Sequence, residues 1–333
     1  MAVAEATREL AIPVRTERGP LADAFQQLLA NKMAVASGVF IIFLLFIAIF
    51  ADNALIAVPL GREVVPLLAP EAFDQVHFRL NNAAPSRQYL LGNDYLGRDM
   101  LSRTLYGARV SLAVAFSAAT VSLLIGLVYG LASGYFGGRV DDIMMRVVDF
   151  LYGFPILIFV ILLQVYFKAI SRRGGTGLVG TVISLNEAMG GMFFLFVALG
   201  ALNWLQMARI ARGQVLSYKE KEFIEAARMV GAGDMRIIFR HLLPNILGPC
   251  IVAETLAIPT YIFWEAFLSF LGLGVEPPTP SWGIMISDAY QALRSYPYQL
   301  VGPSVALTLT TLAFNFLGDG LRDAFDPRLR GTM

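Results

Sequence analysis

The stretch SYKEKEFIEAARMVGAGDMRIIFRHLLPN, residues 217–245, is polar and helix-prone and lies between two long apolar runs. Residues 219–230 are rich in alanine and in straight-chain side chains, which have high helix propensity. Apolar residues recur there at helical spacing, which predicts a short amphipathic helix. The apolar stripe of this helix consists of Phe223, Ile224, Ala227 and Val230.

The same stretch contains signals for a turn and for a second helix. We expect Gly231 and Gly233 to end the first helix, because glycine readily adopts the left-handed conformation after a helix end. Asp234 can cap a second helix that runs to Leu243, and we expect Pro244 to end it. A compact helix pair exposed at one face of the membrane would offer a surface to which another protein can bind. The periodicity fits an interfacial helix on lipid headgroups equally well.

The whole chain has the composition of a polytopic membrane protein. Of its 333 residues, 56% are hydrophobic and only 15% are charged, and the mean hydropathy is +0.62. A soluble domain of this size does not need so much apolar surface. The formal net charge of +1 gives no indication of a nucleic acid partner. The single cysteine, Cys250, excludes a disulfide framework and a cysteine metal site, and His77 and His241 have no ligand spacing around them.

Six apolar segments are long enough to cross the hydrocarbon core of a membrane, which takes about 20 residues. We therefore predict an all-α, polytopic membrane protein with six transmembrane helices. They form a transmembrane domain over residues 33–320, between an N-terminal tail (1–32) with an amphipathic helix at the membrane surface and a C-terminal tail (321–333). The predicted spans are residues 33–50, 110–136, 150–167, 188–208, 246–272 and 295–318.

The distribution of charge predicts the orientation of these spans. Lys and Arg outnumber Asp and Glu seven to four between residues 209 and 241, which by the positive-inside rule places the 217–245 loop in the cytoplasm. Six crossings then put both termini in the cytoplasm and the long polar loop at residues 52–109 outside. Three basic residues fall on the outer side in this topology, against the general bias: Lys168, Arg172 and Arg173.

Small residues and a proline mark the second and third spans. Gly126, Gly130 and Gly134 recur every four residues, a pattern that lets a second helix approach closely, and we expect them to form a packing face. Pro155 follows Phe154 in the third span and predicts a kink, whose freed backbone groups neighbouring helices must satisfy.

The fifth span differs from the others because it contains two carboxylates, Glu254 and Glu265. They lie about three helical turns apart, so both can point to one face of the helix. Ionisable groups at membrane depth are functional candidates, because they are costly unless they are paired or wet. We expect both to be buried between helices, at a translocation path or at a subunit interface.

The stretch LGNDYLGRD, residues 91–99, lies toward the end of the outer loop. Its glycines predict a turn in which Arg98 and Asp99 pair locally. For Asp94, Arg98 and Asp99 this structural role is favoured over contact with a substrate.

Four groups of residues resemble motifs of the permease subunits of ABC importers, in the same order along the chain. Glu225-Ala226-Ala227, Gly231 and Leu243-Pro244 resemble the EAA motif, the loop that docks into a cleft of the ATPase subunit. The stretch at 91–99 is similar to the GTDxxGRD segment of oligopeptide and dipeptide permeases, with Asn93 where threonine is usual. Residues 268–274 and 280–283 resemble their SFLGLG and PSWG outer loop, and residues 318–327 their GDGLRDxxDP tail.

One position departs from the general EAA pattern. His241 stands where an isoleucine is frequent, but together with Pro244 and Asn245 it reproduces the His-x-x-Pro-Asn ending that is typical of the peptide and nickel permeases. The departure therefore points to this branch of the family.

The resemblance covers the chain from about residue 30 to residue 330 and implies the ABC type I importer permease fold of the OppC/DppC type. The implied partners are a homologous second permease subunit, two cytoplasmic ATPase subunits, an external substrate-binding protein and membrane lipid, in a bacterial cytoplasmic (inner) membrane. It implies no cofactor, metal or nucleic acid on this chain, whereas ATP and Mg would bind to the ATPases. The residues implied in coupling to them are Phe223, Glu225, Ala226, Ala227, Gly231, Ala232 and Pro244.

Motifs of other functional classes are absent from the sequence. There is no GxxxxGK[ST] loop to cradle nucleotide phosphates, and neither HExxH nor GxSxG occurs, so no catalytic site is expected. A secondary transporter driven by an ion gradient is a different class that fits the apolar composition, but it would have no use for an amphipathic docking helix. Oligopeptides or dipeptides are the expected substrates, with nickel chelates and other small solutes as alternatives.

Overall fold

The computed structural model describes residues 20–53, 64–189 and 191–325. Residues 1–19 and 326–333, which belong to the two predicted tails, lie outside this part. The described chain is all-α, with isolated β-bridges but no strand. Its α-helices are α2 (Pro20–Ala30), α3 (Lys32–Phe50), α5 (Met100–Phe136), α6 (Gly138–Tyr152), α7 (Ile156–Arg173), α8 (Leu178–Ala188), α9 (Met192–Tyr218), α10 (Glu222–Met229), α11 (Asp234–Arg236), α12 (Leu243–Phe270), α13 (Trp282–Gln291) and α14 (Tyr298–Phe325). A 3₁₀ turn at Phe78–Leu80 and a π-helical segment at Ile237–Leu242 complete the helical structure.

Within these described ranges, four helical runs are long and apolar enough to cross a membrane. They are α3, α5, α14 and the continuous run Asp234–Phe270, which includes α12. Two bent pairs, α6 with α7 and α8 with α9, raise the number to six if each pair forms one span. The predicted class, an all-α protein with several membrane helices, is confirmed.

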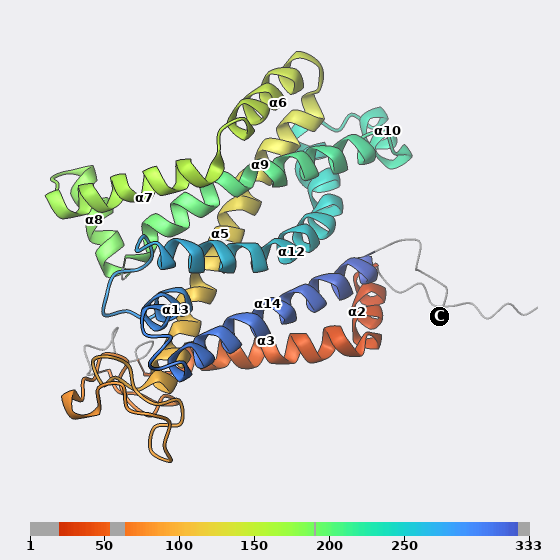
Figure 1. The fold of residues 1–333 in the computed structure, drawn as a ribbon. Coiled ribbons are helices and arrows are strands. Elements are labelled where there is room, and N and C mark those ends of the chain that lie inside the picture. The colour runs from red at the N-terminus through yellow and green to blue at the C-terminus, as the bar shows by residue number, and fades with distance from the viewer. Residues whose placement is uncertain (1–19, 54–63, 190, 326–333) are drawn as a thin grey trace, which may run out of the picture.

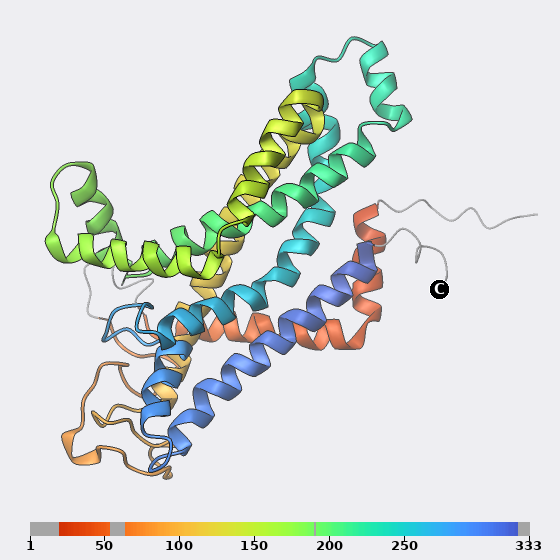
Figure 2. The ribbon, with the colours of Figure 1, turned by 45° about the horizontal axis from the view of Figure 1, so that its top comes forward.

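The elements are arranged around the long helix α5. Figure 1 shows α3 and α14 running side by side, with α2 across one end of this pair. The segment 64–99 lies at the beginning of α5, and α10 projects from the molecule near the other end of α5 (Figures 1 and 2). The outer loop of the prediction and the 217–245 loop are therefore at opposite ends of the molecule.

The glycines of α5 form the packing face that the sequence predicts. A Cβ atom added at Gly126 would lie 2.5 Å from the Cβ of Met207, and one at Gly130 would lie 2.5 Å from the carbonyl oxygen of Ala208. Gly134 in turn faces Val215, so all three glycines meet α9. Small residues let the two backbones approach closely, and this prediction is confirmed.

The beginning of α5 differs from the expected helix boundary. The helix starts at Met100 and not near Val110, because Asp99 caps it: its carboxylate accepts hydrogen bonds from the backbone N–H groups of Leu101 and Ser102. Residues 100–109, which are predicted to belong to the outer loop, are therefore part of α5.

The expected kink at Pro155 is a full break. Helix α6 ends at Tyr152, α7 begins at Ile156, and the two axes meet at 80°. Proline has no N–H to donate and disfavours helical conformation in the residue before it, so the chain turns sharply at this point. The stretch between the third and fourth predicted spans, residues 168–187, is largely helical, because α7 continues to Arg173 and α8 follows.

The N-terminal helix α2 packs against α14 at its C-terminal end. A Cβ atom at Gly320 of α14 would lie 2.3 Å from the Cβ of Ala34 and 3.3 Å from the Leu28 side chain. Asn31 separates α2 from α3 and caps α3 by accepting from the N–H groups of Met33 and Ala34. Phe25 and Leu29 of α2 are exposed, which suits the predicted contact with a membrane surface.

Candidate functional site

The 217–245 loop contains the helix that the sequence analysis predicts. Helix α10 is anchored by Ile224, which is completely buried in an apolar cluster with Leu127, Val215 and Leu242. Ala227 is half-buried, as a member of the predicted stripe should be. Phe223 and Val230 are both exposed, Val230 to 89%, so neither belongs to the buried part of the predicted stripe. The predicted stripe is therefore wrong at both positions, and Val230 lies beyond the end of α10 at Met229.

The end of α10 has the geometry that glycine permits. Gly231 has a φ of 86°, and its N–H donates to the carbonyl of Arg228 at 2.9 Å, while the N–H of Ala232 donates to the carbonyl of Ala227 at 3.0 Å. These two bonds form a Schellman motif, which satisfies the last carbonyl groups of the helix. The prediction that Gly231 ends the helix is confirmed. Gly233 has a φ of −71° and takes no left-handed conformation.

The second helix starts differently from the prediction. Gly233 occupies the extended cap position, with ψ at 161°, so Asp234 is the first helical residue and not the cap. The Asp234 carboxylate instead accepts a hydrogen bond of 2.6 Å from the Tyr135 hydroxyl of α5. The predicted cap is therefore wrong.

Pro244 does not end the second helix. The chain continues through the π-helical segment Ile237–Leu242 into α12, and Pro244 lies in the first turn of α12. A proline ring collides with the carbonyl four residues before it. The wider π turn, in which the N–H of Leu243 donates to the carbonyl of Ile238, accommodates the proline without a break.

The remaining residues of the implied coupling set differ in their exposure. Glu225 and Ala226 are exposed on α10, and Ala232 is half-buried behind it. The Glu225 carboxylate makes no hydrogen bond or ion pair with the described residues. Several large apolar side chains of this region are exposed as well: Met229, Val230, Met235 and Phe239. An exposed apolar surface with free carboxylates is what a protein partner can bind.

The two carboxylates of the fifth predicted span are both buried. Glu254 is 6% exposed and Glu265 is 0% exposed, as the sequence analysis predicts. Glu265 accepts hydrogen bonds from Ser111 of α5 at 2.9 Å and from Ser269 at 2.7 Å. Glu254 accepts from Tyr261 at 2.6 Å and from Ser122 of α5 at 3.5 Å. Whether they adjoin a translocation path or a subunit interface stays a prediction.

These contacts form a ladder between α5 and α12. Ser111 and Ser122 are separated by the same number of positions as Glu265 and Glu254, about three helical turns in each helix. The two antiparallel helices are therefore joined by two hydrogen bonds, one between Ser111 and Glu265 and one between Ser122 and Glu254. Neither carboxylate has an ion-pair partner among the described residues, so hydroxyl groups alone satisfy them.

Ser111 also connects Glu265 to the segment before α13. Its hydroxyl accepts from the backbone N–H of Trp282 at 3.3 Å, and the indole N–H of the buried Trp282 donates to the carbonyl of Thr104 at 3.0 Å. The PSWG segment is thus packed against the N-terminal part of α5.

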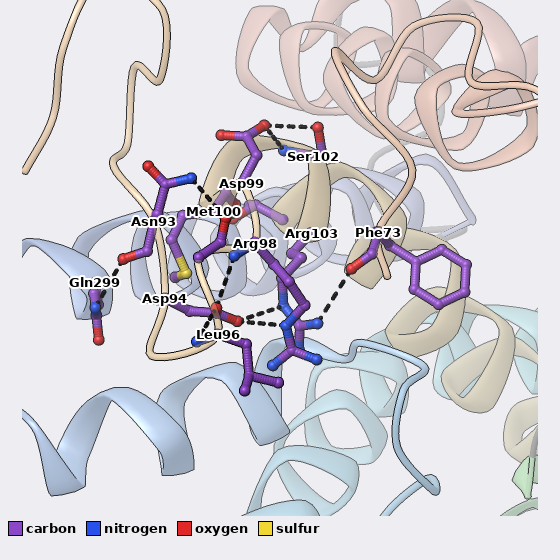
Figure 3. Close-up of polar contacts among 12 residues, drawn as sticks. Phe73, Asn93, Asp94, Leu96, Arg98, Asp99, Met100, Ser102, Arg103 and Gln299 are labelled. Atoms are coloured by element: carbon purple, nitrogen blue, oxygen red, sulfur yellow. Dashed lines mark hydrogen bonds and ion pairs between the residues drawn. The ribbon is translucent and has the colours of Figure 1, made fainter. Parts of the chain in front are cut away.

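The charged residues of the 91–99 segment, Asp94, Arg98 and Asp99, form a buried cluster with Arg103 (Figure 3). Arg98 donates through Nε to Asp94 at 2.7 Å, and Arg103 of α5 lies 3.6 Å from the same carboxylate. The prediction that Arg98 pairs with Asp99 is wrong, because Asp99 is occupied as the cap of α5 and accepts from the Ser102 hydroxyl at 2.6 Å. All of these contacts are local, and whether the segment also meets a substrate stays a prediction.

The charged cluster also contacts α13 and α14. Gln299 of α14 donates to the backbone carbonyl of Asn93 at 2.9 Å, as Figure 3 shows. Asp288 of α13 shares a small pocket with Asp94 and Arg103. Burial raises the pKa of the Asp288 carboxyl above its ordinary value, although the guanidinium of Arg103 acts in the opposite direction.

Sequence reasoning missed several of these partners. The equal spacing of Ser111 and Ser122 on α5 and of the two glutamates on α12 is visible in the sequence, but it becomes informative only when the helices are known to be neighbours. Arg103, Asp288 and Tyr135 carry no pattern that would single them out. In the described part of the chain, no group of three His, Cys, Asp or Glu side chains is placed to hold a metal ion.

Comparison with known proteins gives consistent matches over most of the chain. Residues 122–331 match the family described as "Binding-protein-dependent transport system inner membrane component", and residues 19–85 match "N-terminal TM domain of oligopeptide transport permease C". The dipeptide transport system permease protein DppC of Bacillus subtilis is 43% identical over 92% of this chain and 86% of its own length. The oligopeptide permease OppC of the same organism is 39% identical over 92% and 90%.

A solved structure of the inward-facing methionine ABC transporter MetNI also matches. It has 21% sequence identity and a TM-score of 0.48, and the match covers 68% of this chain and 97% of that chain.

Proposed function

Because this chain belongs to the family of binding-protein-dependent transport system inner membrane components, we propose that it carries oligopeptides or dipeptides into a bacterial cell. It is a membrane permease subunit of an ABC importer and has no ATPase site of its own. The peptide substrate is inferred from the relatives, which are named as dipeptide and oligopeptide permeases.

The geometry of α10 is the observation that supports coupling to an ATPase most directly. One buried side chain, Ile224, and one left-handed residue, Gly231, fix the position of the helix. Glu225 and Ala226 are left exposed. A helix that is rigidly attached on one side and free on the other can be displaced by a partner and can pass the displacement to the membrane helices.

The proposed complex contains a second, homologous permease subunit, two cytoplasmic ATPases and an external substrate-binding protein. ATP and Mg bind to the ATPases. Closure of the ATPase pair moves α10 with the cleft that holds it, and the membrane helices then change the side on which the path is open. ATP drives this change only because the ATPases contact the two states of the permease differently through the 217–245 loop.

Reconstitution tests this function. The tagged chain is purified with the subunits that bind to it and placed in liposomes with the binding protein. Uptake is measured for isotopically labelled dipeptides and tetrapeptides, and for a nickel chelate. We expect peptide uptake that requires ATP and Mg. Uptake driven by an imposed proton or sodium gradient without ATP would identify a secondary transporter, and uptake of the nickel chelate alone would contradict the peptide assignment.

A further inference from the structure

The last turn of α5 contacts three other parts of the chain through three successive residues. Ser133 binds α6, Gly134 binds the beginning of the 217–245 loop, and Tyr135 binds the first residue of α11, which follows α10. We call these three residues the α5 bracket.

The first contact fixes the bracket to its surroundings. The Ser133 hydroxyl donates to the Asp141 carboxylate of α6. The same carboxylate accepts two hydrogen bonds from Arg212 of α9, at 2.6 and 2.5 Å. A two-point pair of this kind has a defined geometry as well as a charge, so the bracket, α6 and α9 are held together.

The other two contacts hold both ends of the helix α10 and its flanking turns. Lys219, just before α10, donates through Nζ to the Gly134 carbonyl at 3.1 Å. This carbonyl is one of the last four of α5, which have no partner inside the helix. Tyr135 donates its hydroxyl to Asp234, just after α10, at 2.6 Å. The segment between Lys219 and Asp234 is therefore attached at both ends to adjacent residues of one helix.

We propose that Tyr135 and Lys219 are positioning residues that transfer a displacement of α10 to α5, and that the serine and glutamate ladder carries it from α5 to α12. This depends on the proposed function as the permease of an ATP-driven importer. The Tyr135–Asp234 and Lys219–Gly134 bonds lie at or near the surface, where such contacts add little to stability. Their loss should loosen the connection and leave the fold intact.

The test removes one hydroxyl at a time from the full complex in liposomes. Tyr135→Phe deletes the donor to Asp234. The matched control is Tyr218→Phe, at the beginning of the same loop, where the deleted hydroxyl makes no hydrogen bond in the described chain. The rates of peptide uptake and of ATP hydrolysis are measured in the same liposomes, with the labelled dipeptides and tetrapeptides as substrates. The readout is the number of peptides transported per ATP hydrolysed.

We expect Tyr135→Phe to lower transport per ATP hydrolysed about two- to tenfold, the range that corresponds to one lost hydrogen bond. Unfolding temperature and co-purification with the ATPases should not change, and Tyr218→Phe should behave as the wild type. Asp234→Asn, which still accepts from the tyrosine, should keep most of the coupling. Asp234→Ala should lower the ratio as Tyr135→Phe does, and the double variant should lose less than the sum of the two single losses, because both changes remove the same hydrogen bond.

The outcomes separate the two proposals. A wild type that transports peptide with ATP, combined with an unchanged ratio in Tyr135→Phe, contradicts the bracket alone. Equal losses in Tyr135→Phe and Tyr218→Phe, or additive losses in the double variant, also contradict it. A wild-type complex that moves no peptide with ATP contradicts the proposed function.

Discussion

At the scale of single residues, Gly231 and Gly233 look alike in the sequence and differ in the structure. Gly231 has a φ of 86°, whereas Gly233 has a φ of −71° and a ψ of 161°, which any residue can adopt. A Cβ atom at either position would meet no atom within 4 Å. A substitution therefore tests backbone conformation alone, without a steric clash.

We predict that Gly231→Ala weakens binding of the ATPases, because an L-residue at this φ costs about 1 kcal/mol. The variant would then adopt the Schellman conformation at the end of α10 less often than the wild type does. Gly233→Ala is the control and should bind as the wild type does. The measurement is the amount of ATPase that co-purifies with each tagged variant, with membrane insertion checked in parallel. If Gly231→Ala and Gly233→Ala co-purify with the same amount of ATPase, the left-handed turn at Gly231 has no role in docking.

Glu265 allows a second test at this scale, because both of its carboxylate oxygens accept from serine hydroxyls. Glu265→Gln can accept from one serine and donate to the other, so we expect a loss of less than about 1 kcal/mol in stability. Glu265→Ala leaves buried hydroxyl groups without a partner and opens a cavity, at a cost of about 3 kcal/mol.

Thermal unfolding in detergent measures this difference. The control is Glu187→Ala, which removes an exposed glutamate of α8 and should leave the unfolding temperature unchanged. If the Gln and Ala variants of Glu265 unfold at the same temperature, the serine contacts do not contribute to stability.

At the scale of elements, the contact between α5 and α9 depends on the absence of side chains at three positions of α5. The atoms nearest to an added Cβ at Gly130 include backbone atoms of α9, the Ala208 carbonyl oxygen and the Arg212 nitrogen. Backbone atoms cannot move aside as the end of a flexible side chain can. The two helices would have to separate.

We predict that Gly130→Ala destabilises the protein by about 1–3 kcal/mol, the usual cost of overpacking. Gly213 of α9 is a matched control, because it is helical and an added Cβ would meet nothing within 4 Å. Gly213→Ala should raise stability by about 0.5–1 kcal/mol through helix propensity. Unfolding temperatures of the two variants should move in opposite directions, and a shift in the same direction would contradict the packing role.

The elements show which features the sequence could predict. Runs of apolar residues, the glycine spacing in α5 and the glycine that ends α10 are local signals, and the structure agrees with them. The wrong predictions concern residues whose partner is chosen by tertiary structure. Asp99 caps a helix instead of pairing with Arg98, and Asp234 binds Tyr135, which lies far away in the sequence. Pro244 failed as a stop signal because a π turn accommodates it.

At the scale of the whole molecule, the two polar regions lie at opposite ends, as Figure 2 shows. The proposed topology puts α10 in the cytoplasm and the segment 64–99 outside. Val230 and Phe78 are highly exposed reporters of the two ends, at 89% and 78%. The native Cys250 is fully buried and should not react with a thiol reagent.

We predict that a membrane-impermeant maleimide labels Val230→Cys only in inverted vesicles and Phe78→Cys only in intact spheroplasts. The wild type, with Cys250 as its one thiol, measures the background in both preparations. Labelling of both variants from the same side would overturn the topology and, with it, the assignment of α10 to the ATPase side.

The length of α5 has a consequence for how the two surfaces influence each other. Its 37 residues correspond to roughly 55 Å of helix, more than the thickness of a bilayer with its headgroups. One unbroken rod thus starts in the charged cluster at one end and finishes in the bracket at the other. If an external protein prefers one position of this rod, thermodynamic reciprocity requires that a partner at the far end change the affinity of that protein by an equal factor. Release of the external binding protein and closure of the ATPase pair would then depend on the same conformational equilibrium of α5.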